Sequence, residues 1–219
     1  MKIRACIFDL DGVIVDTAQY HFQSWKKIAD QLGIQFSELE NEHLKGVSRM
    51  QSLDFILNLG NRQIDQVYKE ELAGEKNAGY LDFIKALSPQ DVFTGVRPLL
   101  EDLKKNHVRI ALGSSSRNAR LILGKLGLLG YFNIVVDGND VKAAKPDPEI
   151  FLNAASKLGV KPEDTVIFED AIAGTEAAFQ GGFRCVGIGS SELLVKATLV
   201  LPSLEGLTFS KLKRLLDQY

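Results

Sequence analysis

The chain opens with an apolar run that ends in a polar turn. Ile3 and residues 5–8 are apolar, and Asp9, Asp11 and Gly12 follow almost at once. A short continuous apolar run bounded by turn residues is typical of a strand that is buried on both faces of a parallel sheet. We therefore predict a strand over residues 3–8 with the two aspartates at its carboxyl end.

Between residues 16 and 89 the apolar positions recur at helical spacing, and nothing alternates like a strand. This spacing predicts four helices. Caps and glycines bound them: Asp16 and Gly33 for the first, Ser37 with Glu40 for the second, Gly60 after the third, and a fourth that starts at Ile64 and resumes at Leu81 and Ile84.

From residue 92 onward, predicted strands alternate with predicted helices. We expect strands at 108–112, 134–136, 165–168 and 185–188, and helices at 98–105, 119–126, 148–158, 173–180 and 210–217. Such alternation indicates the α/β class, here a Rossmann-like parallel sheet with helices on both faces. The predicted organisation is a core domain of residues 1–16 and 92–219 and a helical cap domain of residues 17–91. Because the cap leaves just after the first strand, it would hang over the strand ends as a lid.

Composition narrows the class of protein. The 219 residues are 45% hydrophobic, and 26 basic against 28 acidic residues give a net charge of −2. This balance provides no basic surface for nucleic acid or membrane. No segment resembles a transmembrane helix or a signal peptide, so we expect a cytoplasmic protein, and without a heptad seam we expect a monomer. Cys6 and Cys185 lie in predicted strands and are expected to be buried apolar residues.

Asp9 and Asp11 are the first candidate chemical groups. In an extended chain, residues two apart point the same way, so both carboxylates would face one small volume. One can act as a nucleophile or bind a hard cation while the other moves a proton. The alternative is a solvated Asp-rich turn after a strand.

Polar residues suited to phosphate and metal follow three further strands. The segment from Ser114 to Asn118 opens a helix and can hold an anion, although serines there are often ordinary caps. Lys145 stands in a stiff Lys-Pro-Asp-Pro turn and can neutralise phosphate, unless it is a surface lysine. Glu169 and Asp170 are paired acids without a Cys or His cluster, which favours Mg²⁺ over zinc.

Four motifs in order resemble those of the haloacid dehalogenase superfamily: the Asp9 to Val13 segment, Ser114, Lys145-Pro146 and Glu169-Asp170. The resemblance covers the whole chain. It implies that Asp9 attacks a phosphoryl group and that Asp11 exchanges a proton with the substrate hydroxyl. It also implies that Ser114 and Lys145 hold the transferring oxygens. Mg²⁺ would be held by Asp9, the Asp11 carbonyl and Asp170, with Glu169 in its shell. The Asp11 carboxyl argues against dehalogenase chemistry.

In the helical insert, four stretches stand out: Asp16 to Phe22, Trp25, Leu44 to Arg49 with Ser52, and Lys76-Asn77. They resemble those of the β-phosphoglucomutase family. This resemblance implies interconversion of β-D-glucose 1-phosphate and D-glucose 6-phosphate through β-glucose 1,6-bisphosphate. The residues that would bind this sugar phosphate are Thr17, His21, Trp25, Lys45, Gly46, Val47, Ser48, Arg49, Ser52, Lys76, Ser115, Ser116, Arg117 and Asn118, and Asn77 also fits the family. Arg49, Ser116, Arg117 and Asn118 would hold the phosphate farther from Asp9. The chain departs from the family at Arg117, where a lysine is usual, and at Ser115, where a small apolar residue is usual.

Other interpretations share these residues. The main alternative is a Mg²⁺-dependent sugar-phosphate phosphatase of the same superfamily, because the core motifs are common to both. A non-catalytic sugar-phosphate binding protein is a third, which the Asp9 nucleophile disfavours. His21 could instead be a packed histidine, Trp25 a core residue, and Lys45 to Arg49 an exposed basic loop. We expect Thr17 and residues 91–94 to form the hinge of the cap.

Overall fold

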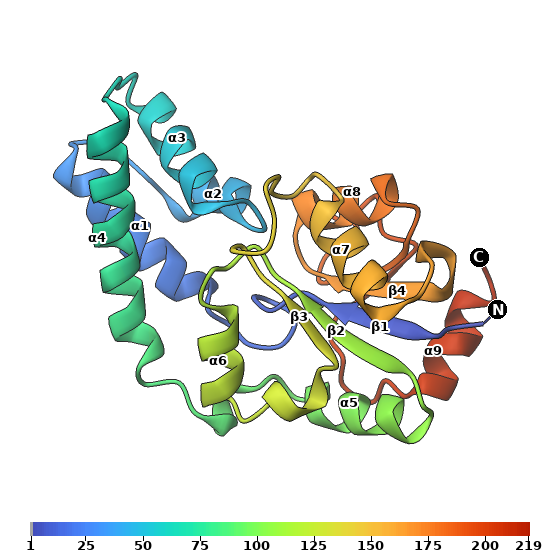
Figure 1. The fold of residues 1–219 in the computed structure, drawn as a ribbon. Helices are drawn as coiled ribbons and strands as arrows, with labels where there is room; N and C mark the ends of the chain where they lie inside the picture. Colours follow the sequence, from blue (N-terminus) through green and yellow to red (C-terminus); the bar gives the residue numbers. More distant parts are fainter. Residues whose placement is uncertain (1) are drawn as a thin grey trace.

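A computed structural model describes residues 2–219 and contains a single six-stranded sheet (Figure 1). Its strands are β1 (Ala5–Phe8), β2 (Arg109–Gly113), β3 (Ile134–Val136), β4 (Thr165–Glu169), β5 (Arg184–Ile188) and β6 (Leu199–Leu201). They lie in the order β3-β2-β1-β4-β5-β6, and every neighbouring pair is parallel. The predicted α/β class is confirmed. The pattern missed β6, a half-exposed edge strand of three residues that is too short to show a period.

Helices cover both faces of the sheet. α5 (Val96–Lys105), α6 (Ala119–Lys125) and α9 (Phe209–Leu216) pack on one face, while α7 (Glu149–Leu158) and α8 (Ile172–Gln180) pack on the other (Figure 1). β1 alternates between them, since Cys6 and Phe8 belong to the first apolar core and Ala5 and Ile7 to the second. Cys6 and Cys185 are both buried, free thiols, as predicted.

The strand register brings the predicted chemical groups to one edge. Phe8 pairs with Leu112 of β2 and with Phe168 of β4. The Asp9 amide then donates to the Phe168 carbonyl at 2.9 Å, so Asp9 leaves the sheet level with Glu169. Ligands of open parallel sheets bind outside these carboxyl ends.

The segment after β1 is helical and has an apolar core of its own. It contains α1 (Ala18–Gln31), α2 (Glu38–Asn41), the 3₁₀ turn η1 (Glu42–Leu44), α3 (Arg49–Leu59) and α4 (Gln66–Ile84). The predicted break in the fourth helix is wrong, because α4 is continuous. Its middle looked too polar for a packed helix because Gly74 and Lys76 line a cavity. Further 3₁₀ turns are η2 (Pro89–Asp91), η3 (Leu129–Tyr131) and η4 (Pro162–Asp164).

The two connections between the sheet and the helical segment, near residues 15 and 92, lie side by side. Val15 bridges both Asp11 and Val92, and the Phe93 amide donates to the Ile14 carbonyl at 2.9 Å. The helix α1 begins differently from the prediction. Its N-cap is Thr17, whose side chain makes no cap bond, whereas Asp16 accepts a hydrogen bond from the Ala18 amide at 3.1 Å. The Thr17 hydroxyl does not cap the helix because it donates to the Asp11 carboxylate instead.

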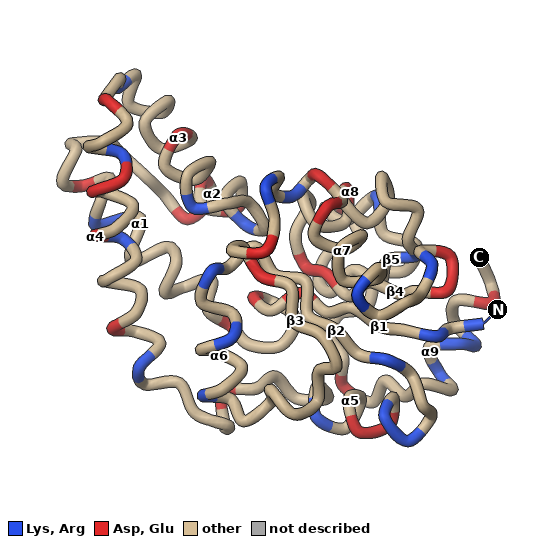
Figure 2. The backbone as a smooth tube through the Cα atoms, viewed as in Figure 1, with Lys and Arg blue, Asp and Glu red and all other residues tan. Residues whose placement is uncertain are grey.

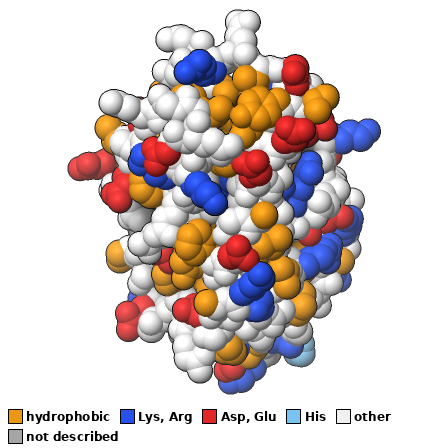
Figure 3. All heavy atoms as spheres, turned by 90° about the vertical axis from the view of Figure 1, so that its left-hand side faces the viewer, with side chains coloured by type: hydrophobic (Ala, Val, Ile, Leu, Met, Phe, Trp, Pro, Cys, Tyr) orange, Lys and Arg blue, Asp and Glu red, His pale blue; other side chains and the backbone are white. Residues whose placement is uncertain are grey.

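Charge is distributed without a dominant patch on the views shown. Figure 2 shows basic and acidic positions interspersed along the chain, with acidic positions where strands end beneath the helical segment. On the face in Figure 3 both signs are also mixed with scattered apolar side chains. No helix in residues 2–219 is long and apolar enough to cross a membrane.

Candidate active site

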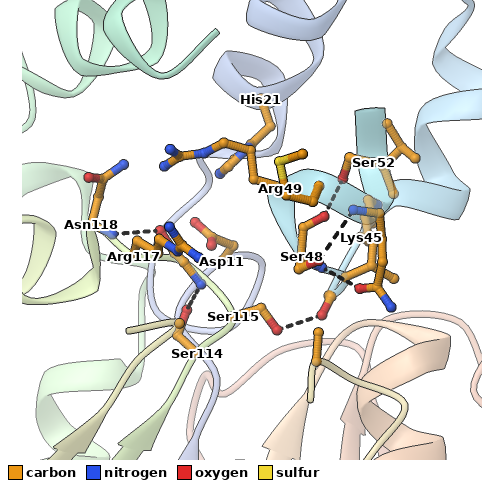
Figure 4. A pocket seen from close by; sticks show the side chains of 18 of the residues that line it. Asp11, His21, Lys45, Ser48, Arg49, Ser52, Ser114, Ser115, Arg117 and Asn118 are labelled. Carbon is orange, nitrogen blue, oxygen red and sulfur yellow. Dashed lines mark hydrogen bonds between the residues drawn. The ribbon is translucent and has the colours of Figure 1, made fainter. Parts of the chain in front are cut away.

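A cavity of about 680 Å³ lies between the strand ends and the helical segment. Both parts contribute to its wall, as the close view shows (Figure 4). Of the predicted site residues, the wall includes Asp9, Asp11, His21, Trp25, the Lys45 to Arg49 segment, Ser52, Lys76, the Ser114 to Asn118 segment and Asp170. Its volume is in the range of small-molecule sites.

Asp9 and Asp11 follow β1 and both reach the cavity. Gly12 permits this arrangement because its φ is +78°, and a Cβ there would lie 2.0 Å from Oδ2 of Asp170. The turn is therefore shaped so that Asp170 can lie against it. The period-two expectation that both aspartates face one volume agrees with their shared place on the wall.

Lys145 joins the acids from beneath. Its Nζ donates to Oδ1 of Asp9 and to Oε1 of Glu169, each at 2.6 Å, and all three side chains are buried. Burial alone would lower the pKa of Lys145, but the Asp9 and Glu169 carboxylates raise it above its ordinary value. The ammonium is thus charged, and its third hydrogen has no acceptor within residues 2–219.

Burial and neighbouring carboxylates raise the pKa values of Asp11 and Asp170. Burial first, and then the Asp9 carboxylate, raises the pKa of Asp11 to about 8. Burial, with the charges of Glu169 and Asp9, holds the pKa of Asp170 well above its usual range. A buried cluster of carboxylates with this much mutual repulsion is stabilised by a proton or by a bound cation.

The free carboxylate oxygens suit a hard cation. Glu169 is fully engaged, since Oε1 accepts from Lys145 and Oε2 accepts from the Ala171 amide at 2.7 Å. Asp170 accepts no hydrogen bond from any described residue and faces Gly12. The part of the chain described here has no cluster of three or more His, Cys, Asp or Glu side chains arranged for a metal. An oxygen-seeking ion would therefore need backbone oxygens and water in addition to Asp9 and Asp170, which is the usual habit of Mg²⁺.

On the opposite wall, His21 and Lys76 form a pair. Lys76 Nζ lies 2.7 Å from Nδ1 of His21, and it also lies over the Trp25 and Tyr80 rings. Burial first, and then the Arg49 charge, lowers the pKa of Lys76 to about 7. Burial, Lys76 and Arg49 also lower the pKa of His21, so its ring is neutral and Nδ1 accepts from Lys76.

Arg49, Arg117 and Asn118 form a second polar end of the cavity. The Arg49 guanidinium donates to Oδ1 of Asn77 at 2.7 Å, and Asn118 Nδ2 donates to the same oxygen at 3.0 Å. Burial first, and then the nearby Arg117 charge, lowers the pKa of Arg49, so the two guanidinium groups are close enough to repel. A doubly charged anion between them would remove this repulsion.

The segment Lys45–Ser48 connects η1 to α3 and lines the cavity. Ser48 caps α3 in a capping box with Gln51, and Ser52 Oγ donates to the Ser48 carbonyl at 3.1 Å. Lys45 is paired with Glu42 at 2.8 Å. These contacts define where Arg49, the first residue of α3, enters the cavity.

Three predicted site residues lie behind the wall. Thr17, Lys145 and Glu169 are fully buried and reach the site through Asp11 and Asp9. Sequence reasoning also missed wall residues, among them Asn41, Met50, Gln51, Glu70, Ala73, Gly74, Gly138 and the Val141 to Ala144 segment. A polar and glycine-containing stretch inside a predicted helix was the signal available for Glu70 and Gly74.

A family model described as haloacid dehalogenase-like hydrolase matches residues 3–182. The chain belongs to this family. It is 43% identical to a β-phosphoglucomutase of Bacillus subtilis (strain 168), with 99% of this chain and 97% of the relative covered. A crystal structure of β-phosphoglucomutase from Clostridium difficile matches with a TM-score of 0.96 at 42% identity, with 99% and 98% of the two chains covered.

Two sugar-phosphate phosphatases are also similar to the chain. A phosphorylated carbohydrates phosphatase of Thermotoga maritima is 34% identical, with 83% of each chain covered. A fructose-1-phosphate phosphatase of Escherichia coli (strain K12) is 33% identical, with 85% of this chain and 97% of the relative covered. The comparisons thus place the mutase at higher identity and leave the phosphatase as the competing activity.

Proposed function

We propose that this chain is a β-phosphoglucomutase, an isomerase that interconverts β-D-glucose 1-phosphate and D-glucose 6-phosphate through β-glucose 1,6-bisphosphate. The observation that carries the proposal is the presence of two groups of anion-binding residues at one cavity. Asp9 and Ser114 line the cavity where the strands end, with Lys145 bonded to Asp9 from behind the wall, and Arg49 and Arg117 line it as a second group. A mutase must hold a sugar with two phosphates and so needs two phosphate-binding groups, whereas a phosphatase that acts on a monophosphate needs one.

The proposal divides the chain into a core domain of residues 1–16 and 92–219 and a cap domain of residues 17–91. The cap residues proposed to bind the sugar phosphate surround the cavity from above, and the core residues Ser115 to Asn118 do so from the side. All of these groups come from one chain, so the proposal needs no second copy.

Asp9 is the proposed nucleophile. A carboxylate oxygen of phosphorylated Asp9 gives its phosphoryl group to a sugar hydroxyl, and the hydroxyl proton passes to Asp11. The sugar bisphosphate then presents its other phosphate to Asp9. The aspartate oxygen forms a bond to phosphorus while the sugar C–O–P bond breaks at the phosphorus, and Asp11 returns its proton to the sugar oxygen. Asp9 is then phosphorylated again, and the total number of phosphoryl groups is unchanged.

Lys145 and Ser114 are proposed to hold the transferring oxygens. Lys145 has an unused hydrogen, and the Ser114 hydroxyl accepts from the Ser116 amide at 3.2 Å, which leaves its own hydrogen for an anion. Thr17 donates to Asp11 and orients the carboxyl that moves the proton. Positioning and charge neutralisation of this kind account for most of the catalysis in phosphoryl transfer.

Mg²⁺ is the proposed cofactor. Asp9, Asp170 and the Asp11 carbonyl would hold it. Glu169 was expected in its shell, but both of its oxygens are engaged by Lys145 and the Ala171 amide, so only its negative charge would act on the ion. When bound, it supplies positive charge to the phosphoryl oxygens.

The alternative is a Mg²⁺-dependent sugar-phosphate phosphatase, which the two phosphatase relatives support. The two activities differ only in what accepts the phosphoryl group from Asp9. The test is to supply the purified protein with Mg²⁺, β-glucose 1-phosphate and a trace of glucose 1,6-bisphosphate, and to follow glucose 6-phosphate and free phosphate together. Glucose 6-phosphate without matching free phosphate supports the mutase, and stoichiometric free phosphate supports the phosphatase.

A further inference from the structure

The Ser115 hydroxyl joins the two parts of the molecule at the mouth of the cavity. Ser115 follows β2 in the core, and its Oγ donates to the Gly46 carbonyl of the helical segment at 2.6 Å (Figure 4). A serine hydroxyl has one hydrogen to donate. While it is bonded to Gly46, it has none for a phosphate oxygen, although Ser115 was predicted to bind the substrate.

Gly46 is also seated on the core from another side. Its φ is +76°, and a Cβ there would come within 3.1 Å of the Ala171 Cβ, just before α8 begins. Ser115 and Ala171 therefore hold the same residue between two core elements. Gly46 lies two residues before the α3 cap Ser48 and three before Arg49, so these contacts hold the chain on the core just ahead of α3.

A second hydrogen bond from the same core loop reaches the helical segment. Asn118 Nδ2 donates to Asn77 on α4, and Asn77 accepts from Arg49 as well. The loop after β2 thus holds the cap at Gly46, three residues before Arg49, and at Asn77, which Arg49 itself contacts. Movement of the cap away from the core would break both bonds, whereas movement within the cap would not.

We propose that Ser115 is a positioning residue: its hydrogen bond to Gly46 holds the Lys45–Ser48 segment over the cavity and thereby keeps water from phosphorylated Asp9. The consequence for activity rests on the proposed mutase function, but the structural effect on the segment does not. Ser115 acts through the cap backbone and not on the sugar phosphate.

The first test needs no substrate. Hydrogen exchange is measured for the amides of Lys45 and Ser48, which donate to the Glu42 carbonyl and to Gln51 Oε1. Ser115→Ala should raise their exchange about fivefold, the factor that corresponds to the loss of one neutral hydrogen bond. Ser115→Thr keeps the donor and should restore most of the protection. Ser24→Ala is the matched control, because Ser24 donates to the Tyr20 carbonyl at 2.7 Å within α1 and touches no core residue through that bond.

The second test measures the consequence for water. During turnover of β-glucose 1-phosphate, Ser115→Ala should raise the free phosphate released per glucose 6-phosphate about fivefold, and Ser115→Thr should return it toward the wild-type ratio. Unchanged exchange at Lys45 and Ser48 in Ser115→Ala overturns the proposal, even if the Michaelis constant rises, since that combination means direct contact with substrate. A second outcome separates the two proposals. If exchange rises in Ser115→Ala but the wild type releases only free phosphate, the positioning role of Ser115 stands and the mutase function is rejected.

Discussion

Asp11 is held in place by a hydrogen bond, and its pKa is raised by burial and by a neighbouring carboxylate. Thr17 donates to its carboxylate, and burial together with Asp9 raises its pKa to about 8. A carboxyl with this pKa is protonated at neutral pH in the absence of a cation, so it is poised to give a proton to a leaving oxygen. Across the cavity, the cations Arg49 and Arg117 are crowded in the same way. Each set of like charges is relieved by a ligand of the opposite sign.

Asp11→Asn should lower turnover by roughly two to four orders of magnitude, because an amide cannot exchange the substrate proton. Mg²⁺ affinity should stay nearly unchanged, since the proposed ligand at this residue is its backbone carbonyl. Steady-state kinetics and calorimetric titration with Mg²⁺ check both parts, with Asp16→Asn as the control in the neighbouring turn. Loss of Mg²⁺ affinity in Asp11→Asn would show that the carboxyl group itself binds the metal.

Arg49→Ala should raise the Michaelis constant for β-glucose 1-phosphate by roughly 10- to 100-fold, the usual range for removing a charged hydrogen-bond donor. Phosphorylation of Asp9 by acetyl phosphate should change little, since that small donor has no second phosphate. The control is Arg62→Ala, which removes a guanidinium whose one hydrogen bond within residues 2–219 goes to the Leu32 carbonyl. Equal losses in both reactions would remove Arg49 from the distal phosphate site.

The lowered pKa of Lys76 predicts that the free energy of unfolding depends on pH. Its pKa falls from 10.5 to about 7 on folding, so between these values the unfolded chain holds a proton that the folded chain has lost. Stability therefore rises with pH in this window, by up to about 1.4 kcal/mol per pH unit. Between pH 7.5 and 9.0, urea unfolding should show the free energy of the wild type rising by about 2 kcal/mol relative to Lys76→Met. Parallel curves for the wild type and Lys76→Met, with Lys27→Met as the surface control, would contradict the shift.

At the scale of elements, the parallel strands bring the site side chains together, and a helix cap positions Arg49. Asp9, Ser114 and Asp170 are far apart in sequence, yet the register of β1, β2 and β4 brings their strand ends to one edge. In the helical segment, α3 begins at a capping box that places Arg49 at the cavity. The start of α3 therefore contributes to both stability and ligand binding.

The capping boxes of α2 and α3 offer a matched comparison. Ser37 caps α2 and Ser48 caps α3, each with a reciprocal side-chain bond. Replacing either serine by alanine should lower the free energy of unfolding by about 1 kcal/mol. Only Ser48→Ala should also weaken sugar-phosphate binding, because it loosens the helix start that carries Arg49. Urea unfolding and substrate titration of both variants test this, and equal effects on binding would contradict it.

The strands and most helices were predictable because their signals are local. β1 is an unbroken apolar run, and Gly33 follows α1 in a left-handed conformation, with φ of +68°. The start of α1 was misjudged because Thr17 gives its hydroxyl to Asp11, a contact made only after folding. The continuity of α4 was missed for a similar reason, since its polar face is occupied by the cavity and not by solvent.

At the scale of the whole molecule, the site exists only between the two parts. The core alone provides Asp9, Lys145 and Asp170, and the order of their motifs along the chain led to their prediction as site residues. The contacts that close the cavity, such as Ser115 to Gly46 and Asn118 to Asn77, pair residues with no recognisable spacing. They depend on how the cap sits on the core, which local patterns do not encode. We expect these contacts between cap and core to decide whether the sugar or water accepts the phosphoryl group.

The most direct test of the account follows one phosphoryl group through a single turnover. The protein is phosphorylated on Asp9 with labelled acetyl phosphate, freed of excess donor, and mixed with Mg²⁺ and an excess of β-glucose 1-phosphate. The account predicts that the label appears first in glucose 1,6-bisphosphate and then in glucose 6-phosphate, with little in inorganic phosphate. Label passing mainly to inorganic phosphate, at the same rate with and without the sugar, would contradict it and identify water as the natural acceptor.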